Sequence, residues 1–149
     1  MKSALEYDVN RASPVQIAEL LQACDDKFVP PLSGRVEIIG YSARIHERAM
    51  RFEAWSSDAL IGLVAIYCND ENGKAAFVTS VSVLPEFQGR GIGSQLVARG
   101  IQHVRGLGFS RIELEVNSQN KGAIRLYRRQ GFLVDGQKGQ SAIMKLNLA

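Results

Sequence analysis

Apolar side chains alternate with polar ones in some stretches of this chain and recur at helical spacing in others. Alternation predicts strands at residues 4–10, 51–56, 59–67, 75–83, 111–116, 133–134 and 142–148. Helical spacing predicts helices that open at Ser13-Pro14 and near Ile92, and two more over 35–49 and 119–130. The resulting order, β-α-α-β-β-β-α-β-α-β-β, predicts an α/β fold in which helices flank a mixed sheet.

Turn-forming residues separate these elements. Ser57-Asp58 predicts the turn of a hairpin, and Asn72-Gly73 predicts a second turn before the next strand. Residues 25–33 contain Pro30-Pro31, which cannot continue a helix, so we expect a loop there.

Length and composition limit the class of protein. The length of 149 residues and the hydrophobic content of 46% predict a single domain that spans residues 1–149. No apolar run approaches the roughly 20 residues of a membrane span, and residues 1–6 carry no apolar signal region, so we expect a cytoplasmic protein that does not bind membranes. Cys24 and Cys68 belong to no recognisable cysteine motif, so we expect both to be reduced thiols. The two histidines lack the spacing of metal ligands, which predicts that no metal is bound.

Charge is distributed unevenly along the chain. Residues 1–84 hold 8 basic and 11 acidic side chains, a net charge of −3, whereas residues 85–149 hold 10 basic and 4 acidic ones, a net charge of +6. A positive field over the second part suits a ligand that carries phosphates, although an ordinary solvated surface would give the same numbers. Nucleic acid is not an expected partner, because no long basic run is interleaved with aromatic residues.

A glycine-rich segment follows the strand at 75–83. Pro85 ends the strand, and Gly89, Gly91 and Gly93 then lead into a helix. Backbone N–H groups at such a turn are not covered by side chains and lie at the positive end of the helix macrodipole, which predicts a diphosphate site. The spacing matches neither the P-loop nor the dinucleotide fingerprint, and a turn without a ligand would give the same short cluster.

Two sequence blocks together resemble a known family. The first is Val83-x-Pro85-x-x-Gln88-Gly89-x-Gly91-Ile92-Gly93, and the second runs from Asn120 through Ala123 and Leu126-Tyr127 to Gly131-Phe132. In this order and spacing, over about residues 75–135, they resemble the GCN5-related N-acetyltransferases. The resemblance implies a central sheet that is splayed between its fourth and fifth strands, with acetyl-CoA in the gap.

The resemblance also divides the chain and assigns cofactor contacts. It implies an acceptor-side half at about 1–74, an acetyl-CoA-binding core at about 75–135 and a terminal strand within 136–149. The N–H groups of Val81 and Val83 would bind the cofactor, and both side chains could also be core. The other expected cofactor contacts are Gln88, Gly89, Arg90, Gly91, Ile92, Gly93, Ser94, Asn120, Ala123 and Tyr127. Asn120 could instead cap its helix, and Arg90 could point to solvent.

Acetyl transfer to an amine needs a proton donor for the leaving thiolate and an acceptor for the amine proton. By resemblance, Tyr127 is the general acid, because a phenol with a pKa of about 10 is protonated at neutral pH. It could instead be a buried tyrosine packed on Phe132. Glu115 is the expected base, since Leu114-Glu115-Val116 resembles the protein N-terminal acetyltransferases, but it could also be exposed or paired with Arg111 or Arg125.

The acceptor is less constrained than the cofactor. We expect an acetyl-CoA-dependent N-acetyltransferase that acts by direct attack in a ternary complex on a small primary amine, such as an amino sugar, an amino acid or a polyamine. Asp25, Asp26 and Phe28 are expected at the acceptor site, although the two carboxylates could be a solvated helix end. A protein N-terminus as acceptor and a non-catalytic acyl-CoA sensor are the alternatives. Strand 142–148 is expected at a sheet edge, through which a homodimer could form.

Overall fold

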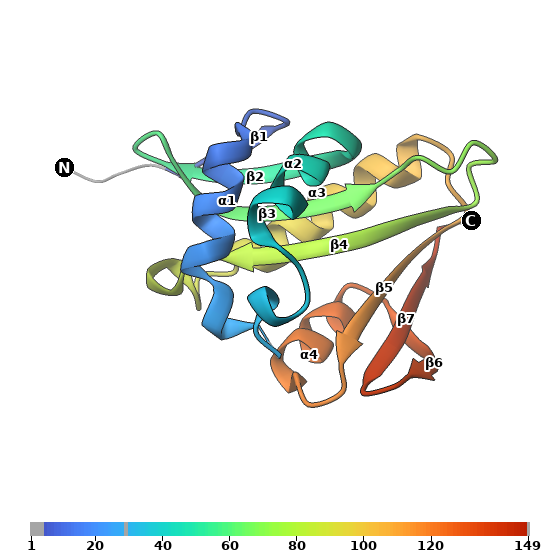
Figure 1. Ribbon diagram of the computed structural model, residues 1–149. Helices are drawn as coiled ribbons and strands as arrows, with labels where there is room; N and C mark the ends of the chain where they lie inside the picture. The colour runs from blue at the N-terminus through green and yellow to red at the C-terminus, as the bar shows by residue number, and fades with distance from the viewer. Residues whose placement is uncertain (1–4, 29, 149) are drawn as a thin grey trace.

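Figure 1 shows the computed structural model, which describes residues 5–28 and 30–148. Its strands are β1 (Leu5–Val9), β2 (Ala49–Ser56), β3 (Ala59–Tyr67), β4 (Ala75–Val83), β5 (Arg111–Asn117), β6 (Leu133–Lys138) and β7 (Ser141–Asn147). Its α-helices are α1 (Pro14–Ala23), α2 (Ile38–Arg48), α3 (Ile92–Gly106) and α4 (Lys121–Arg129), and short 3₁₀ turns lie at Asp25–Lys27, Leu32–Gly34 and Pro85–Phe87. The predicted order of strands and α-helices is confirmed; Ala4, expected in the first strand, lies outside the described residues.

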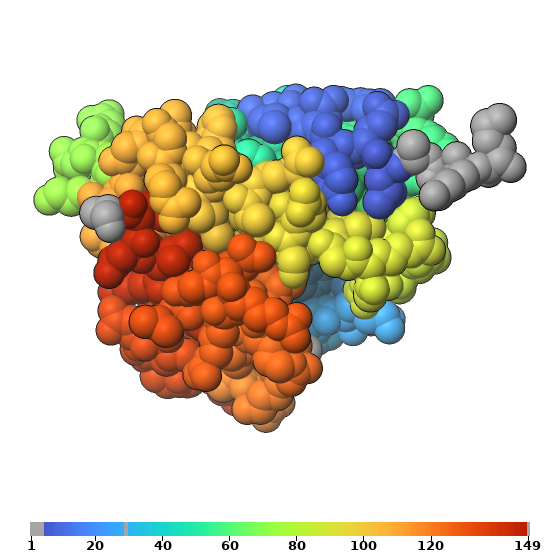
Figure 2. All heavy atoms as spheres, turned by 180° about the vertical axis from the view of Figure 1, so that it is seen from behind, coloured from blue at the N-terminus to red at the C-terminus, as the bar shows by residue number. Residues whose placement is uncertain are grey.

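One mixed sheet joins the strands in the order β1-β2-β3-β4-β5-β7-β6. The helices α1 and α2 cover one face, where Leu21 and Ile45 share a core with Leu63 of β3. The helices α3 and α4 cover the other face, where Leu96 and Tyr127 belong to a second core. Figure 2 shows this second face from behind, with α3 above α4. The predicted α/β class, with helices flanking a mixed sheet, is confirmed.

The sheet opens between β4 and β5. These parallel strands pair only near their starts, as Ala75 with Arg111, Ala76 with Ile112 and Phe77 with Glu113. Beyond that point residues 78–83 and 114–117 diverge, and Figure 1 shows the two strands separating toward α4. The splay that the family resemblance implied is therefore confirmed, and it leaves backbone groups of β4 unpaired in the middle of the sheet.

The start of α2 differs from the prediction. The chain first makes a 3₁₀ turn, and the N–H groups of Arg35 and Val36 donate to Leu32 O at 2.9 and 3.0 Å. Glu37 then caps the helix by accepting from Gly40 N, so α2 begins at Ile38. The expected helix start at Arg35 is wrong, and Arg35 lies in the loop before α2.

The position of β7 also differs from the prediction. This strand pairs with β5 on one side and with β6 on the other, so the expected edge strand at 142–148 is wrong. Its Ala142 and Met144 are buried, as a central strand requires, whereas every residue of β6 is exposed. The outer strands of the sheet are β1 and β6.

Candidate active site

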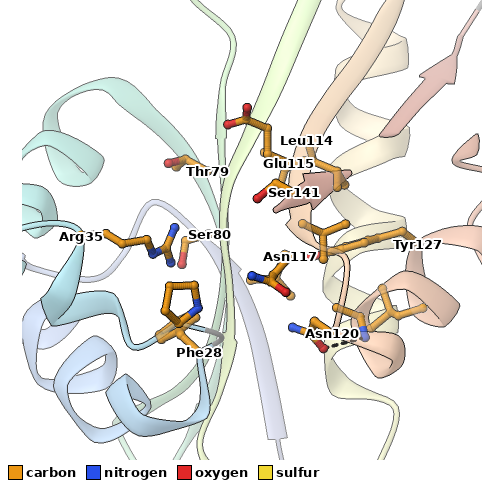
Figure 3. A pocket seen from close by; sticks show the side chains of 16 residues that line it. Phe28, Arg35, Thr79, Ser80, Leu114, Glu115, Asn117, Asn120, Tyr127 and Ser141 are labelled. Carbon is orange, nitrogen blue, oxygen red and sulfur yellow. Dashed lines mark hydrogen bonds between the residues drawn. The ribbon is translucent and has the colours of Figure 1, made fainter. Parts of the chain in front are cut away.

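The gap between β4 and β5 contains a cavity of about 240 Å³. Its walls come from β4, β5, α4 and the loop before α2, as the close view in Figure 3 shows. The lining residues are Phe28, Pro30, Arg35, Val78, Thr79, Ser80, Val81, Leu114, Glu115, Val116, Asn117, Asn120, Ala123, Leu126, Tyr127 and Ser141. The structure thus brings together site residues that were predicted from separate segments, namely Phe28, Val81, Glu115, Asn120, Ala123 and Tyr127.

A bulge interrupts β4 at this cavity. The pairing with β3 passes from Val78 to Ser80 and leaves Thr79 without a partner on that strand. The Tyr41 hydroxyl of α2 donates to Thr79 O at 2.7 Å and lies 2.7 Å from the Thr79 hydroxyl. A bulge bends its strand and increases the local twist, so it contributes to the departure of β4 from β5.

Backbone donors of β4 face the gap. Leu84 N donates to Ile61 O at 2.9 Å, which makes Val83 a member of a non-hydrogen-bonded pair in the antiparallel ladder with β3. Val81, two residues earlier, has the same position in the ladder. The N–H groups of Val81 and Val83 therefore point away from β3, toward the edge that β5 has left. Their use as cofactor donors stays a prediction.

The turn before α3 depends on two glycines in the left-handed region. Gly89 has a φ of 79°, and Gly91, the N-cap of α3, has a φ of 75°. Gln95 N donates to Gly91 O at 3.0 Å, which is the first hydrogen bond of the helix. The N–H groups of residues 92–94 therefore have no acceptor within the helix. These N–H groups and the helix macrodipole give the turn the chemistry of an anion site.

Other side chains brace this turn. Gln88 Nε2 donates at 3.1 Å to the carbonyl at the end of β4, so this predicted cofactor contact also holds the turn against the strand. Gln130 Nε2, just after α4, donates to Ser94 O at 3.1 Å. The Arg90 guanidinium lies 5.1 Å from the centroid of the Phe87 ring, an arrangement that keeps it beside the turn.

The start of α3 lies beside both β4 and α4. Ile92 is buried in the core. A Cβ placed on Gly93 would lie 3.5 Å from Leu126 Cδ1 and 3.8 Å from Val83 Cγ2. The three segments that the sequence assigned to cofactor binding, the end of β4, the start of α3 and α4, therefore meet in space.

Asn120 caps α4. Its Oδ1 accepts from Ala123 N at 3.2 Å, and both residues line the cavity. The capping role, which the sequence left open as an alternative, is thus present. Cofactor binding through the other amide atom of Asn120 stays a prediction.

Tyr127 reaches the cavity from α4 while remaining 8% exposed. Its ring packs edge-on against Phe132, with 5.9 Å between the centroids. Burial raises the pKa of Tyr127 to about 12. The hydroxyl therefore keeps its proton throughout the neutral range, as a general acid for a thiolate requires.

Glu115 occupies the opposite face of β5 from Leu114 and Val116, which are buried. Its Oε1 lies 3.5 Å from Lys138 Nζ, and 39% of its side chain is exposed. Arg111 pairs instead with Glu113, at 2.6 Å, so the alternative pairing of Glu115 with Arg111 is wrong. An exposed ion pair holds its partners weakly, which leaves the Glu115 carboxylate available to an amine.

Of the three residues predicted at the acceptor site, the structure places only Phe28 at the cavity. Asp25 accepts from Ser33 N at 2.7 Å, and hydrogen bonding to Ser33 lowers the pKa of Asp25. Asp26 is exposed, and neither aspartate is among the residues that line the cavity. Phe28 does line it. Any contact of the two aspartates with an acceptor would therefore lie outside this cavity.

Several lining residues were not predicted, among them Arg35, Thr79, Asn117 and Ser141. Thr79 lies at a bulge, for which the alternation of apolar residues gives no signal. The sequence prediction began a helix at Arg35, although the turn residues Ser33-Gly34 just before it indicate that the loop continues.

Residues 5–28 and 30–148 contain neither a cluster of metal-ligating side chains nor a helix that could span a membrane. Among the residues that the structure describes, no group of three or more His, Cys, Asp and Glu side chains could hold a metal ion. Within 5–28 and 30–148, no helix combines the length and apolar character needed to cross a bilayer. Cys24 and Cys68 are free thiols, and burial raises the pKa of each.

Comparison with known sequences identifies acetyltransferases as relatives. The chain is 40% identical over 76 residues to an uncharacterized N-acetyltransferase of Methanocaldococcus jannaschii, a match that covers 48% of this chain and 34% of the relative. It is 37% identical over 76 residues to the mycothiol acetyltransferase of Propionibacterium freudenreichii subsp. shermanii, which covers 50% of this chain and 24% of the relative. The chain thus spans about a third or less of the length of these curated relatives.

Solved acetyltransferases share the fold over nearly the whole chain. The PaiA N-acetyltransferase of Thermoplasma acidophilum, in complex with coenzyme A, matches with a TM-score of 0.75 and 17% identity over 95% of this chain and 99% of that one. The ribosomal-protein-S18-alanine N-acetyltransferase of Escherichia coli matches with a TM-score of 0.73 and 18% identity over 97% and 95%. A model of the acetyltransferase (GNAT) family matches residues 15–132, which is more than half of the chain. The chain therefore belongs to the GNAT acetyltransferase family.

Proposed function

We propose that this protein transfers the acetyl group of acetyl-CoA to the nitrogen of a primary amine, by direct attack in a ternary complex. The observation that carries the proposal is the cavity in the β4–β5 gap, where unpaired N–H groups, a protonated tyrosine and a carboxylate come together. The 40% identity to an N-acetyltransferase supports nitrogen as the acceptor atom.

The residues around the gap fit acetyl-CoA. The N–H groups of Val81 and Val83 suit an amide-bearing arm that adds to the free edge of β4 like another strand. The N–H groups of residues 92–94 suit its diphosphate, and the net charge of +6 over residues 85–149 favours capture of an anion. Acetyl-CoA would supply an activated thioester, and the remaining chemistry would fall to side chains of the cavity.

Two side chains would move the protons. Tyr127 would donate its phenolic proton to the departing sulfur, which its raised pKa permits at neutral pH. Glu115 would accept the proton that the amine loses, directly or through a water. The N–H groups of β4 would stabilise negative charge that develops on the carbonyl oxygen. Val81, Glu115 and Tyr127 line the same cavity, which supports their action on one bound pair of substrates.

A protein N-terminus is the second candidate acceptor. The segment Leu114-Glu115-Val116, whose sequence suggested this class, lines the cavity with all three residues. Acetylation of short peptides but of no free small amine would favour this second candidate.

The proposal is tested by thiol release from acetyl-CoA with a panel of amino sugars, amino acids, polyamines and short peptides. Tyr127→Phe should lower kcat by about 10²–10⁴-fold with little change in the acetyl-CoA KM, because the phenol would act on the leaving group rather than in binding. Tyr7→Phe is the matched control: Tyr7 lies on β1, with Arg99 4.4 Å from its ring centroid, and should keep the wild-type kcat.

Two results would contradict the proposal. If Tyr127→Phe kept the wild-type kcat, the general acid would be another group. If the wild-type protein bound acetyl-CoA in calorimetry but released thiol with no amine or peptide, the chain would be better described as an acyl-CoA sensor.

A further inference from the structure

The cavity between β4 and β5 holds side chains of opposite charge. Arg35 enters it from the loop before α2, and Glu115 enters it from β5 (Figure 3). Glu115 has Lys138 as a partner at 3.5 Å. Arg35 forms no ion pair with a carboxylate of residues 5–28 or 30–148. A guanidinium placed this way at a cavity is a suitable partner for a carboxylate of a ligand.

The loop before α2 holds Arg35 in place. Arg35 N donates to Leu32 O at 2.9 Å, and the Leu32 side chain is buried in the core. Asp25 accepts from Ser33 N at 2.7 Å and so ties the loop to the end of α1. The Pro30-Pro31 pair further restricts the backbone. The guanidinium is therefore carried by a braced segment.

Arg35 also lies on the side of the sheet opposite the cofactor elements. Figure 3 shows the Arg35 side chain on the same side of β4 as Thr79, and Tyr127 of α4 on the other side. The Tyr41 hydroxyl bonds Thr79 at the bulge. Tyr41 belongs to the core on the face covered by α1 and α2, whereas α3 and α4 lie on the other face. An anion bound by Arg35 would therefore belong to the acceptor.

We propose that the acceptor is an amino acid, whose carboxylate binds Arg35 while its amine lies toward Glu115. This inference rests on the proposed N-acetyl transfer and narrows its substrate class. Phe28 and Pro30, which line the same wall, offer apolar surface for the side chain of the amino acid. A polyamine carries only positive charge and does not suit this wall, because Asp25 and Asp26 lie outside the cavity.

The test compares amines that keep, lack or displace the α-carboxylate. Thiol release from acetyl-CoA is measured with phenylalanine, its amide, phenethylamine and a phenylalanyl dipeptide, and with lysine against cadaverine. The wild-type kcat/KM for the free amino acids should exceed that for the amides and decarboxylated amines by about 10- to 100-fold, the range of a charged hydrogen bond.

Variants of Arg35 assign this preference to one side chain. Arg35→Gln should reduce the preference to within about 3-fold, because it removes the charged hydrogen bond, and Arg35→Lys should restore part of it. Differences in the basicity of the amines cancel, because each ratio is compared between variants. Arg48→Gln removes the same charge from the end of α2, outside the cavity, and should keep the full preference.

The outcomes separate this inference from the proposed function. Turnover of cadaverine, phenethylamine or the dipeptide at least as fast as that of the amino acids would overturn the inference and leave N-acetyl transfer standing. A preference for amino acids that survives Arg35→Gln would also overturn it. Absence of thiol release with every amine would overturn the proposed function, and this inference with it.

Discussion

The two sides of the β4–β5 gap differ in the kind of group that they present. On the α3 side the proposed ligand-binding groups are mainly backbone N–H donors, those of Val81 and Val83 and of residues 92–94. On the α2 side they are side chains, chiefly Arg35 and Glu115. Backbone donors bind the same ligand whatever the side chains are, whereas a wall of side chains changes its ligand with each substitution. This division would allow one cofactor to serve with different acceptors.

The largest effect is expected from Glu115, on the side-chain wall. Glu115→Gln should lower kcat by about 10²–10⁴-fold, because the amide cannot accept the amine proton, and should leave the acetyl-CoA KM near its wild-type value. Glu113→Gln is the matched control on the same face of β5, where it pairs with Arg111 at 2.6 Å outside the cavity. Equal kcat values for the two variants would show that the amine loses its proton elsewhere.

The next largest effect is expected on the backbone side. Gly91→Ala should raise the acetyl-CoA KM by about 5- to 30-fold, because a residue with a Cβ costs about 1–2 kcal/mol in the left-handed region. Ser94→Ala keeps the backbone N–H and should change that KM by less than about 3-fold, because it removes only a half-buried hydroxyl. If Ser94→Ala had the larger effect, side chains rather than the backbone would hold the cofactor.

A smaller effect on kcat/KM is expected from Tyr41, through which α2 contacts the bulge of β4. Tyr41→Phe removes the hydroxyl bonded to Thr79 at the bulge of β4. Loss of about 1 kcal/mol of hydrogen bonding should lower kcat/KM for the amine by about 5-fold. Tyr67→Phe, in the same apolar cluster, is the control and should stay within about 2-fold, as it leaves the Thr79 bonds intact. A drop only in thermal stability would make Tyr41 a packing residue.

The smallest expected change is the response of Tyr127 to pH. Its pKa of about 12 keeps the phenol protonated, so kcat should show no alkaline decline from this group below about pH 10. The raised pKa also makes the stability of the fold depend on pH. The stability linked to the Tyr127 proton is present below pH 10. It is lost as the pH rises toward 12, because the unfolded chain gives up that proton before the folded chain does. A decline in kcat near pH 9 that vanished in Tyr127→Phe would contradict this account.

The same division explains what could be read from the sequence. Gly89 and Gly91 were recognisable because their left-handed backbone requires glycine, which fixes their spacing in the chain. The ends of β3 and β4 and the extent of α3 were predictable from apolar periodicity and turn residues. These features depend on local sequence.

The side chains on the α2 side of the gap could not be predicted from local sequence. Arg35 and Glu115 are 80 residues apart in the sequence and share a cavity only because the loop before α2 folds across the splayed sheet. The pairing of Glu115 with Lys138 depends on β6 and β7 forming a hairpin beside β5. The bulge at Thr79 is set by the pairing of two strands, not by one strand's pattern. Tertiary packing decides each of these.

The most direct test of the division is a titration of the isotopically labelled protein with coenzyme A, followed through backbone amide chemical shifts. The account predicts that the largest changes fall on the N–H groups of Val81, Val83 and residues 89–94, with the Arg35 side-chain signal changing only when an amino acid is added. Saturable binding that left those backbone signals unmoved, or that moved the Arg35 signal first, would contradict it.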